Sequence, residues 1–108
     1  KQFEDEASDI LISGNKARKN PYFNMVERTN GRLQKVKNAK KTIMRRQDAP
    51  EVYDMNASIY IWKRKTLLQS DNLFSQKTSI YIMPYERSID IDSDFEWQIV
   101  EFFLSRRN

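Results

Sequence analysis

Two aspartates, Asp90 and Asp92, are the residues of this chain whose type and spacing could do chemistry. They lie in the segment Ser88-Ile89-Asp90-Ile91-Asp92, where apolar residues typical of a strand are followed by a segment with helical periodicity. Because side chains alternate along a strand, we expect both carboxylates on one face, where together they could bind a divalent cation. The alternative is structural: the two acids end a strand and stabilise the positive end of the next helix. The D-x-D pattern alone favours this alternative.

The elements that must position these carboxylates can be read from the periodicity of the chain. Ser93 and Glu96 have the spacing of a capping box, which predicts a helix from this point to the end of the chain. Asn30-Gly31 predicts a hairpin turn. The expected strands are 10–13, 22–27, 32–36, 57–62 and 79–83, and the expected helices are 1–9, 63–69 and 96–106.

Length and composition limit the chemistry. The 108 residues are enough for one small core, and 39% apolar residues with only two glycines and three prolines indicate a packed structure. The absence of cysteine and histidine excludes disulfides, thiolate chemistry and the commonest general base from this segment. Carboxylates, cations and a metal remain. Without an apolar run of membrane-spanning length or a signal-peptide pattern, we expect a cytoplasmic protein that does not enter a membrane.

The positive charge is concentrated in one segment. Residues 28–46 contain eight basic residues and no acidic one, which leaves 11 basic against 15 acidic residues in the rest of the chain. Three interpretations compete: a solvated arm, a nucleic-acid patch, or a cationic wall for a small anionic substrate. No aromatic residue interrupts the basic run, so it lacks a stacking platform and nucleic-acid binding is disfavoured.

Four segments together resemble a known family. They are Asn20–Val26, Arg46–Tyr53 with an R-Q-x-x-P motif, Asn56–Ile61 with N-x-x-I-Y, and Met83–Asp92 with S-I-D-I-D. In order and spacing they are similar to the C-terminal half of the acylneuraminate cytidylyltransferases, the CMP-sialic acid synthetase family. The resemblance covers nearly the whole chain.

The resemblance implies the C-terminal part of an α/β, Rossmann-like nucleotidyltransferase domain with a mixed sheet. In this family CMP is transferred from CTP to a nonulosonic acid of the sialic, pseudaminic or legionaminic type, pyrophosphate is released, and Mg²⁺ is the cofactor. Asp90 and Asp92 match the catalytic, metal-binding D-x-D of the family. A metal is needed there because phosphoryl transfer requires charge neutralisation and alignment of the phosphates.

Three further residues match substrate-binding positions of the family. Arg46 matches the arginine of R-Q-x-x-P, whose guanidinium could hold an anionic oxygen; otherwise it is one more exposed member of the basic run. Asn56 matches an asparagine beside the sugar, and its structural alternative is a turn residue. Tyr60 matches an aromatic residue near the acyl group, and its alternative is a packed strand tyrosine.

Two departures from the family pattern affect these expectations. Asp54 stands where sialic-acid enzymes tend to carry an arginine for the substrate carboxylate, so Arg45, Arg46 or Arg64 would have to replace it, or the sugar differs. The basic, glycine-containing CTP loop is missing, so residues 1–108 are expected to form the C-terminal portion of one domain and to be inactive alone.

The resemblance also implies a homodimer formed through a protruding basic arm, residues 28–52. The open alternatives are a noncatalytic or nucleic-acid-binding small basic domain and, among enzymes, the 3-deoxy-manno-octulosonate cytidylyltransferases.

Overall fold

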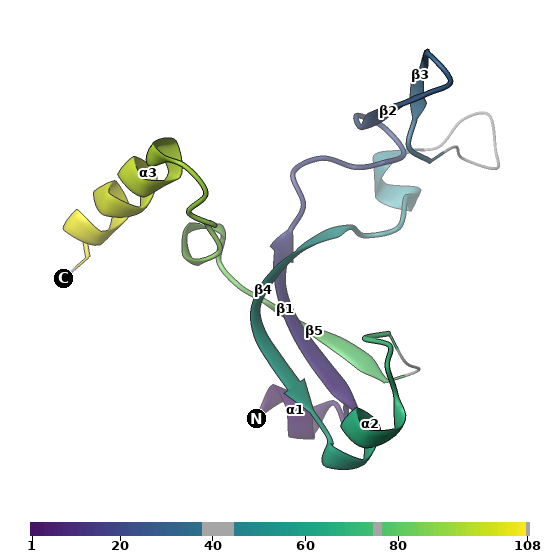
Figure 1. Ribbon diagram of the computed structural model, residues 1–108, viewed down its shortest axis with the longest axis vertical. Helices are drawn as coiled ribbons and strands as arrows, with labels where there is room; N and C mark the ends of the chain where they lie inside the picture. Colours follow the sequence, from purple (N-terminus) through teal and green to yellow (C-terminus); the bar gives the residue numbers. More distant parts are fainter. Residues whose placement is uncertain (38–44, 75–76, 108) are drawn as a thin grey trace. The chain divides into compact units, whose positions relative to one another are not determined.

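The computed structural model describes residues 1–37, 45–74 and 77–107, with only the backbone of Arg46. Lys40 and Lys41 of the basic run lie outside the described residues. The chain divides into two compact units, one made of Lys1–Lys16 with Asp54–Asn108 and the other of Ala17–Tyr53. Figure 1 gives the elements of both units.

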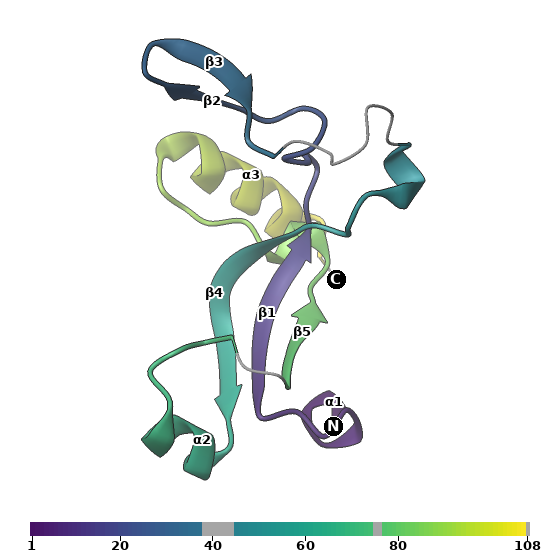
Figure 2. The same cartoon turned by 90° about the vertical axis from the view of Figure 1, so that its right-hand side faces the viewer.

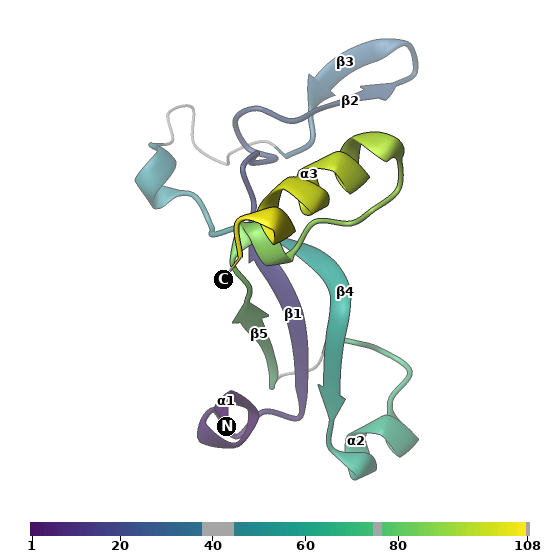
Figure 3. The same cartoon turned by 90° about the vertical axis from the view of Figure 1, so that its left-hand side faces the viewer.

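The first unit is built on a three-stranded sheet. Its strands are β1 (Ile10–Lys16), β4 (Tyr53–Trp62) and β5 (Thr78–Ile82), in the order β4-β1-β5. Strands β1 and β5 are parallel, with Ile10 opposite Thr78. Strand β4 runs in the opposite direction (Figures 2 and 3). The sheet is therefore mixed and is combined with helices, which confirms the predicted α/β class.

The core of this unit is centred on β1. Ile10, Leu11 and Ile12 are the buried apolar residues among those described, with at most 4% of each exposed. Three consecutive buried residues point to both faces of a strand, so β1 is covered on both sides as well as paired at both edges. The predicted strand 10–13 is confirmed and continues to Lys16, because Ser13, Gly14 and Asn15 are buried as well.

The helices of the first unit are short except for the last. They are α1 (Gln2–Asp5), α2 (Arg64–Gln69), the 3₁₀ helix η2 (Tyr85–Arg87) and α3 (Asp94–Ser105). The helix predicted over 1–9 is a single turn, which ends before Ala7, where φ is +50°. Gln2 Nε2 of α1 donates a hydrogen bond of 2.9 Å to the carbonyl of Ile80 in β5. None of the described helices is long and apolar enough to cross a membrane.

The second unit contains a hairpin, β2 (Val26–Thr29) with β3 (Arg32–Lys35), and the 3₁₀ helix η1 (Arg46–Asp48). The turn at Asn30 and Gly31 has φ of +53° and +78°, the left-handed values that the asparagine–glycine pair predicts. The strand predicted over 22–27 is formed only from Val26 onward, so its predicted start at Tyr22 is wrong. Residues 21–24 form a turn, in which the backbone N–H of Tyr22 donates to Asn20 Oδ1.

Gly14 is required by the distance between β1 and β4. A Cβ at position 14 would lie 2.6 Å from the carbonyl oxygen of Asp54 and 2.9 Å from Cδ1 of Ile80. The first contact is with backbone, which cannot rotate away. We therefore expect Gly14→Ala to lower the free energy of unfolding by about 1–3 kcal/mol, the usual cost of overpacking. Urea unfolding monitored by circular dichroism measures this. Lys65→Ala on exposed α2 is the control and should change stability by less than ~0.5 kcal/mol; equal effects would contradict the packing argument.

A hydrogen bond from the Tyr53 hydroxyl to a carboxylate oxygen of Glu51 lies in the second unit. This bond, followed by desolvation and the charge of Glu51, raises the pKa of Tyr53 above its ordinary 10.0. The stabilisation it gives is present below pH 10 and is lost as the pH rises through the raised pKa. We expect Glu51→Gln to move the pKa of Tyr53 back toward 10.0, measured by ¹³C NMR of the tyrosine Cζ. The control is Glu27→Gln: the Glu27 carboxylate accepts a hydrogen bond from Gln34 and not from Tyr53, so its removal should leave the titration of Tyr53 unchanged.

Candidate functional site

Asp90 and Asp92 lie in a loop, not at the end of a strand as the sequence predicted. Strand β5 ends at Ile82, and residues 88–93 have neither strand nor helix geometry. The chain leaves the sheet just before Pro84, which has no N–H to donate to a ladder, and η2 follows directly. The alternation of side chains therefore does not place the two carboxylates on one face. Their shared setting is instead the loop between η2 and α3.

The start of α3 anchors one end of this loop. Ser93 is the residue before the helix, and its hydroxyl donates to the carboxylate of Glu96 at 2.8–2.9 Å. The same carboxylate accepts a hydrogen bond from the backbone N–H of Asp92 at 3.3 Å. Ser93 itself makes no side-chain bond to the helix backbone, and Glu96 meets the Ser93 hydroxyl and the Asp92 N–H instead of the Ser93 N–H, so the predicted capping box is not formed. Glu96 thus ties the backbone of Asp92 to the first turn of α3.

The donor set of the loop suits Mg²⁺. Asp90 and Asp92 are both exposed, and no hydrogen bond or ion pair joins either side chain to the part of the chain described. Their carboxylates offer hard oxygen ligands. The described residues contain no cluster of three or more acidic side chains that could enclose a metal by themselves. Mg²⁺ commonly takes one or two carboxylates and completes its shell with water and phosphate oxygens, so this pair fits such a site.

Asn56 lies in an irregular part of β4. It is 8% exposed, and the next residue, Ala57, has a φ of +56°, which is left-handed and unusual for alanine in a strand. Oδ1 of Asn56 accepts hydrogen bonds from the Ser13 hydroxyl at 2.6 Å and from the Ser58 N–H at 3.2 Å. Nδ2 donates to the sulfur of Met83 at 3.1 Å. The Asn56 side chain is therefore held from three directions, by β1, by its own strand and by the segment after β5.

Sequence reasoning missed Ser13. Its hydroxyl is 1% exposed and also accepts a hydrogen bond of 2.9 Å from the backbone N–H of Ile59. A hydroxyl at the end of the apolar run Ile10–Ile12 is a weak signal, but a buried hydroxyl must find partners, and this one finds them in β4.

Tyr60 lies four residues beyond Asn56 in the same strand, and 43% of the residue is exposed. Its accessible ring and hydroxyl could contact a ligand. The structure thus places Asn56 and Tyr60 on one strand of the first unit, and Asp90 and Asp92 in a loop of that unit. Arg46 belongs to the second unit, where it opens η1, and its side chain lies outside the described residues.

The cations that could replace the missing arginine differ in their surroundings. Asp54 is exposed in β4, so an aspartate in place of an arginine at this position needs no compensating change in the packing. Arg45 Nε lies 3.1 Å from Asp48 Oδ2, so part of its charge is already paired at the surface. Arg64 is the first residue of α2 and is exposed. Of these two side chains, Arg45 is in an ion pair within the described residues and Arg64 is not.

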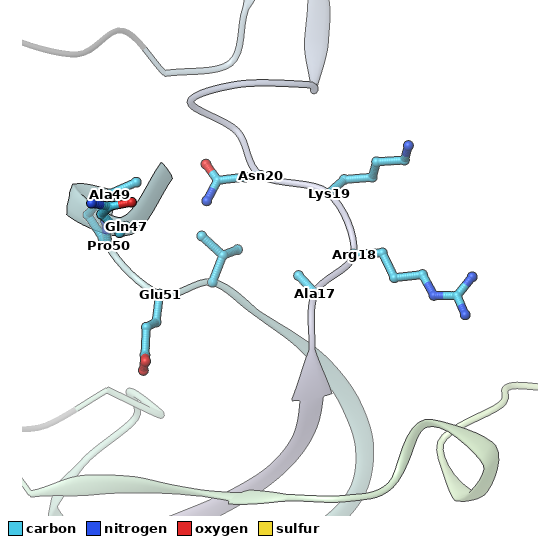
Figure 4. Close-up of a pocket in the computed structure, with 9 residues that line it drawn as sticks. Ala17, Arg18, Lys19, Asn20, Gln47, Ala49, Pro50 and Glu51 are labelled. Atoms are coloured by element: carbon cyan, nitrogen blue, oxygen red, sulfur yellow. The ribbon is translucent and has the colours of Figure 1, made fainter. Parts of the chain in front are cut away.

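The second unit contains a cavity of about 320 Å³. Two segments line it, one that follows β1 and one that contains the R-Q-x-x-P motif and the two residues after it. The lining residues are Ala17, Arg18, Lys19, Asn20, Gln47, Ala49, Pro50, Glu51 and Val52. Figure 4 shows Asn20 pointing toward the space between the two segments, whereas Arg18 and Lys19 point away. The lining is therefore mixed, with small apolar side chains beside the amides of Asn20 and Gln47 and the carboxylate of Glu51, and the side chains of Arg18 and Lys19 point outward. The sequence offered no signal for it beyond the R-Q-x-x-P motif.

Comparison with known proteins tests the resemblance. The chain is 43% identical over 106 residues to post-translational flagellin modification protein B of Campylobacter coli. It is 47% identical over 98 residues to CMP-N,N'-diacetyllegionaminic acid synthase of Campylobacter jejuni. These matches cover 98% and 91% of this chain but 44% and 41% of the relatives, so the chain spans less than half the length of the curated relatives it matches.

No family model matches the chain. The similarity to both relatives nevertheless extends over nearly all of it, at an identity far above what unrelated sequences share. The resemblance inferred from the four sequence segments is thus confirmed: this chain is homologous to part of the protein named CMP-N,N'-diacetyllegionaminic acid synthase.

Proposed function

We propose that the protein carrying this chain transfers CMP from CTP to a nonulosonic acid and releases pyrophosphate. The observation that carries the proposal is the 47% identity to a protein named CMP-N,N'-diacetyllegionaminic acid synthase. The same relative favours a legionaminic-type sugar over sialic and pseudaminic acids. Asp54 supports this choice, because it stands where the resemblance expects an arginine in enzymes that use sialic acid.

In this proposal Asp90 and Asp92 hold Mg²⁺. Both carboxylates are exposed and therefore accessible to a cation, and Glu96 anchors the Asp92 backbone through its N–H. When bound, Mg²⁺ would neutralise charge on the phosphates of CTP. The contribution of the chain itself is to present two carboxylates in the loop before α3.

The sugar would contact Asn56, Tyr60 and Arg46. Asn56 retains one N–H beyond the bond to Met83, which suits it to donate to a hydroxyl or acyl oxygen of the sugar. Tyr60 would pack its exposed ring against the acyl group. Arg46 would pair with the sugar carboxylate, because a guanidinium matches a carboxylate with two parallel hydrogen bonds.

The reaction is tested with the complete protein, CTP, Mg²⁺ and a panel of legionaminic, pseudaminic, sialic and octulosonic acids. We expect pyrophosphate release to be fastest with the legionaminic acid. Asp92→Asn should lower kcat by about 100-fold or more, because several kcal/mol of charge stabilisation would be lost and each 1.4 kcal/mol is tenfold. Asp71→Asn, which removes an exposed carboxylate from the same unit, is the control and should retain full activity. Turnover with the octulosonic acid alone, or full activity of Asp92→Asn, would contradict the proposal.

We propose further that the protein is a homodimer in which the segment 28–52 contacts the partner. The hairpin buries none of its residues: Val26 and Leu33 are each 63% exposed. The register pairs Val26 with Lys35 and Arg28 with Leu33, so these four side chains share one face of the hairpin. Two exposed apolar side chains between two cations form a surface suited to a protein partner.

Leu33→Asp should therefore shift the complete protein toward the monomer, because it puts a negative charge into an apolar contact. Thr29→Asp adds the same charge to the opposite face of the hairpin and should leave the dimer intact. Sedimentation equilibrium gives the mass of each variant. A wild-type protein with the mass of one chain would overturn the proposed dimer.

A further inference from the structure

The buried hydroxyl of Ser13 has a defined proton direction. The backbone N–H of Ile59 can only donate, so Ser13 Oγ accepts along that 2.9 Å contact. The single hydroxyl proton is then available for Asn56 Oδ1 at 2.6 Å. The result is a relay from the β4 backbone, through a side chain of β1, back to a side chain of β4.

This relay fixes which end of the Asn56 amide faces β1. The Ser58 N–H, also a donor only, points at the same Oδ1 at 3.2 Å. Reversing the amide would bring its NH₂ group against the Ser58 N–H, which can only donate, so the reversed orientation loses that hydrogen bond and the one in which the Ser13 hydroxyl donates to Oδ1. Nδ2 must therefore face Met83, whose thioether is a weak acceptor.

The backbone of β4 explains why a side chain of β1 is needed here. Ala57 has a φ of +56°, so the backbone of the strand is irregular at this point. Two residues further on, the Ile59 N–H donates to the Ser13 hydroxyl. Ser13 thus satisfies a backbone donor beside the irregularity and orients Asn56 with the same atom.

We propose that Ser13 is a positioning residue for the sugar site: its hydroxyl holds the Asn56 amide with one N–H directed away from β1 and available to a hydroxyl or acyl oxygen of the substrate. This inference rests on the proposed function of Asn56. Ser13 need not touch the sugar. Its effect is to keep the donor of Asn56 in a single orientation before the substrate arrives, which lowers the cost of binding.

The test compares two buried serines in the complete protein. Ser13→Ala removes the hydroxyl that orients Asn56. Ser8→Ala removes another fully buried hydroxyl of the same unit, one that pairs with Ser79 and not with Asn56. We expect Ser13→Ala to raise KM for the sugar by about 3- to 10-fold, the value of one neutral hydrogen bond, and to leave KM for CTP unchanged. Ser8→Ala should change neither KM, and Ser13→Thr, which keeps a hydroxyl, should restore KM for the sugar to within about twofold.

A second measurement decides the role of Ser13 without turnover. In wild-type protein labelled with ¹⁵N, we expect the two side-chain amide protons of Asn56 to give one pair of well-separated resonances. We expect this separation to be lost in Ser13→Ala and kept in Ser8→Ala. An unchanged Asn56 amide signal in Ser13→Ala, or an unchanged KM for the sugar in an active Ser13→Ala enzyme, overturns the proposal. Absence of turnover in the wild type with every sugar rejects the proposed function instead, and the amide signal still reports on Ser13.

Discussion

The short distance between β1 and β4 is the constraint on which the first unit depends. At Gly14 the Asp54 carbonyl occupies the space that a Cβ would need, and at Ser13 a hydroxyl bridges the strands where β4 is irregular. A larger residue at 14 would separate the strands, and an apolar one at 13 would leave the Ile59 N–H without the hydroxyl to which it donates. The same two residues bring Asn56 against β1. The close packing of the two strands therefore also determines the orientation of a candidate substrate-binding side chain.

The charges of the two units are opposite in sign. Ala17–Tyr53 contains ten of the 19 basic residues and three of the 15 acidic ones, a formal charge of +7, and the remainder carries 9 basic and 12 acidic residues, a charge of −3. Under the proposed function both substrates are anions, CTP and a sugar acid. A basic segment attracts them over several ångströms in a salt-dependent manner, and a carboxylate pair needs a cation before it can meet a phosphate. Under that proposal the basic unit would attract the anionic substrates, and the carboxylate pair lies in the acidic unit.

Much of the fold follows from the sequence, and the departures have physical reasons. The apolar run Ile10–Ile12, the Asn30-Gly31 turn and the periodicity of α3 predict a central strand, a hairpin and a helix, all of which are formed. The strand expected around Ile89 and Ile91 is not formed, because β-propensity requires a neighbouring strand and the chain has already left the sheet at Pro84. Asn56 could be selected from its motif, but not its partners: Ser13 is 43 residues away in sequence and Met83 is 27, and no local pattern encodes such contacts.

The order of the strands has a consequence for synthesis. Strand β1 lies between its two partners in the sheet yet precedes both in the chain, and Thr78, which pairs with Ile10, follows it by 68 residues. At a synthesis rate of about 5–20 residues per second, β1 would leave the ribosome roughly 3–14 s before its parallel neighbour exists. During that interval the most buried of the described strands has no ladder on that side. This unit therefore cannot complete its sheet until Thr78–Ile82 has been synthesised, and until then β1 exposes one unpaired edge.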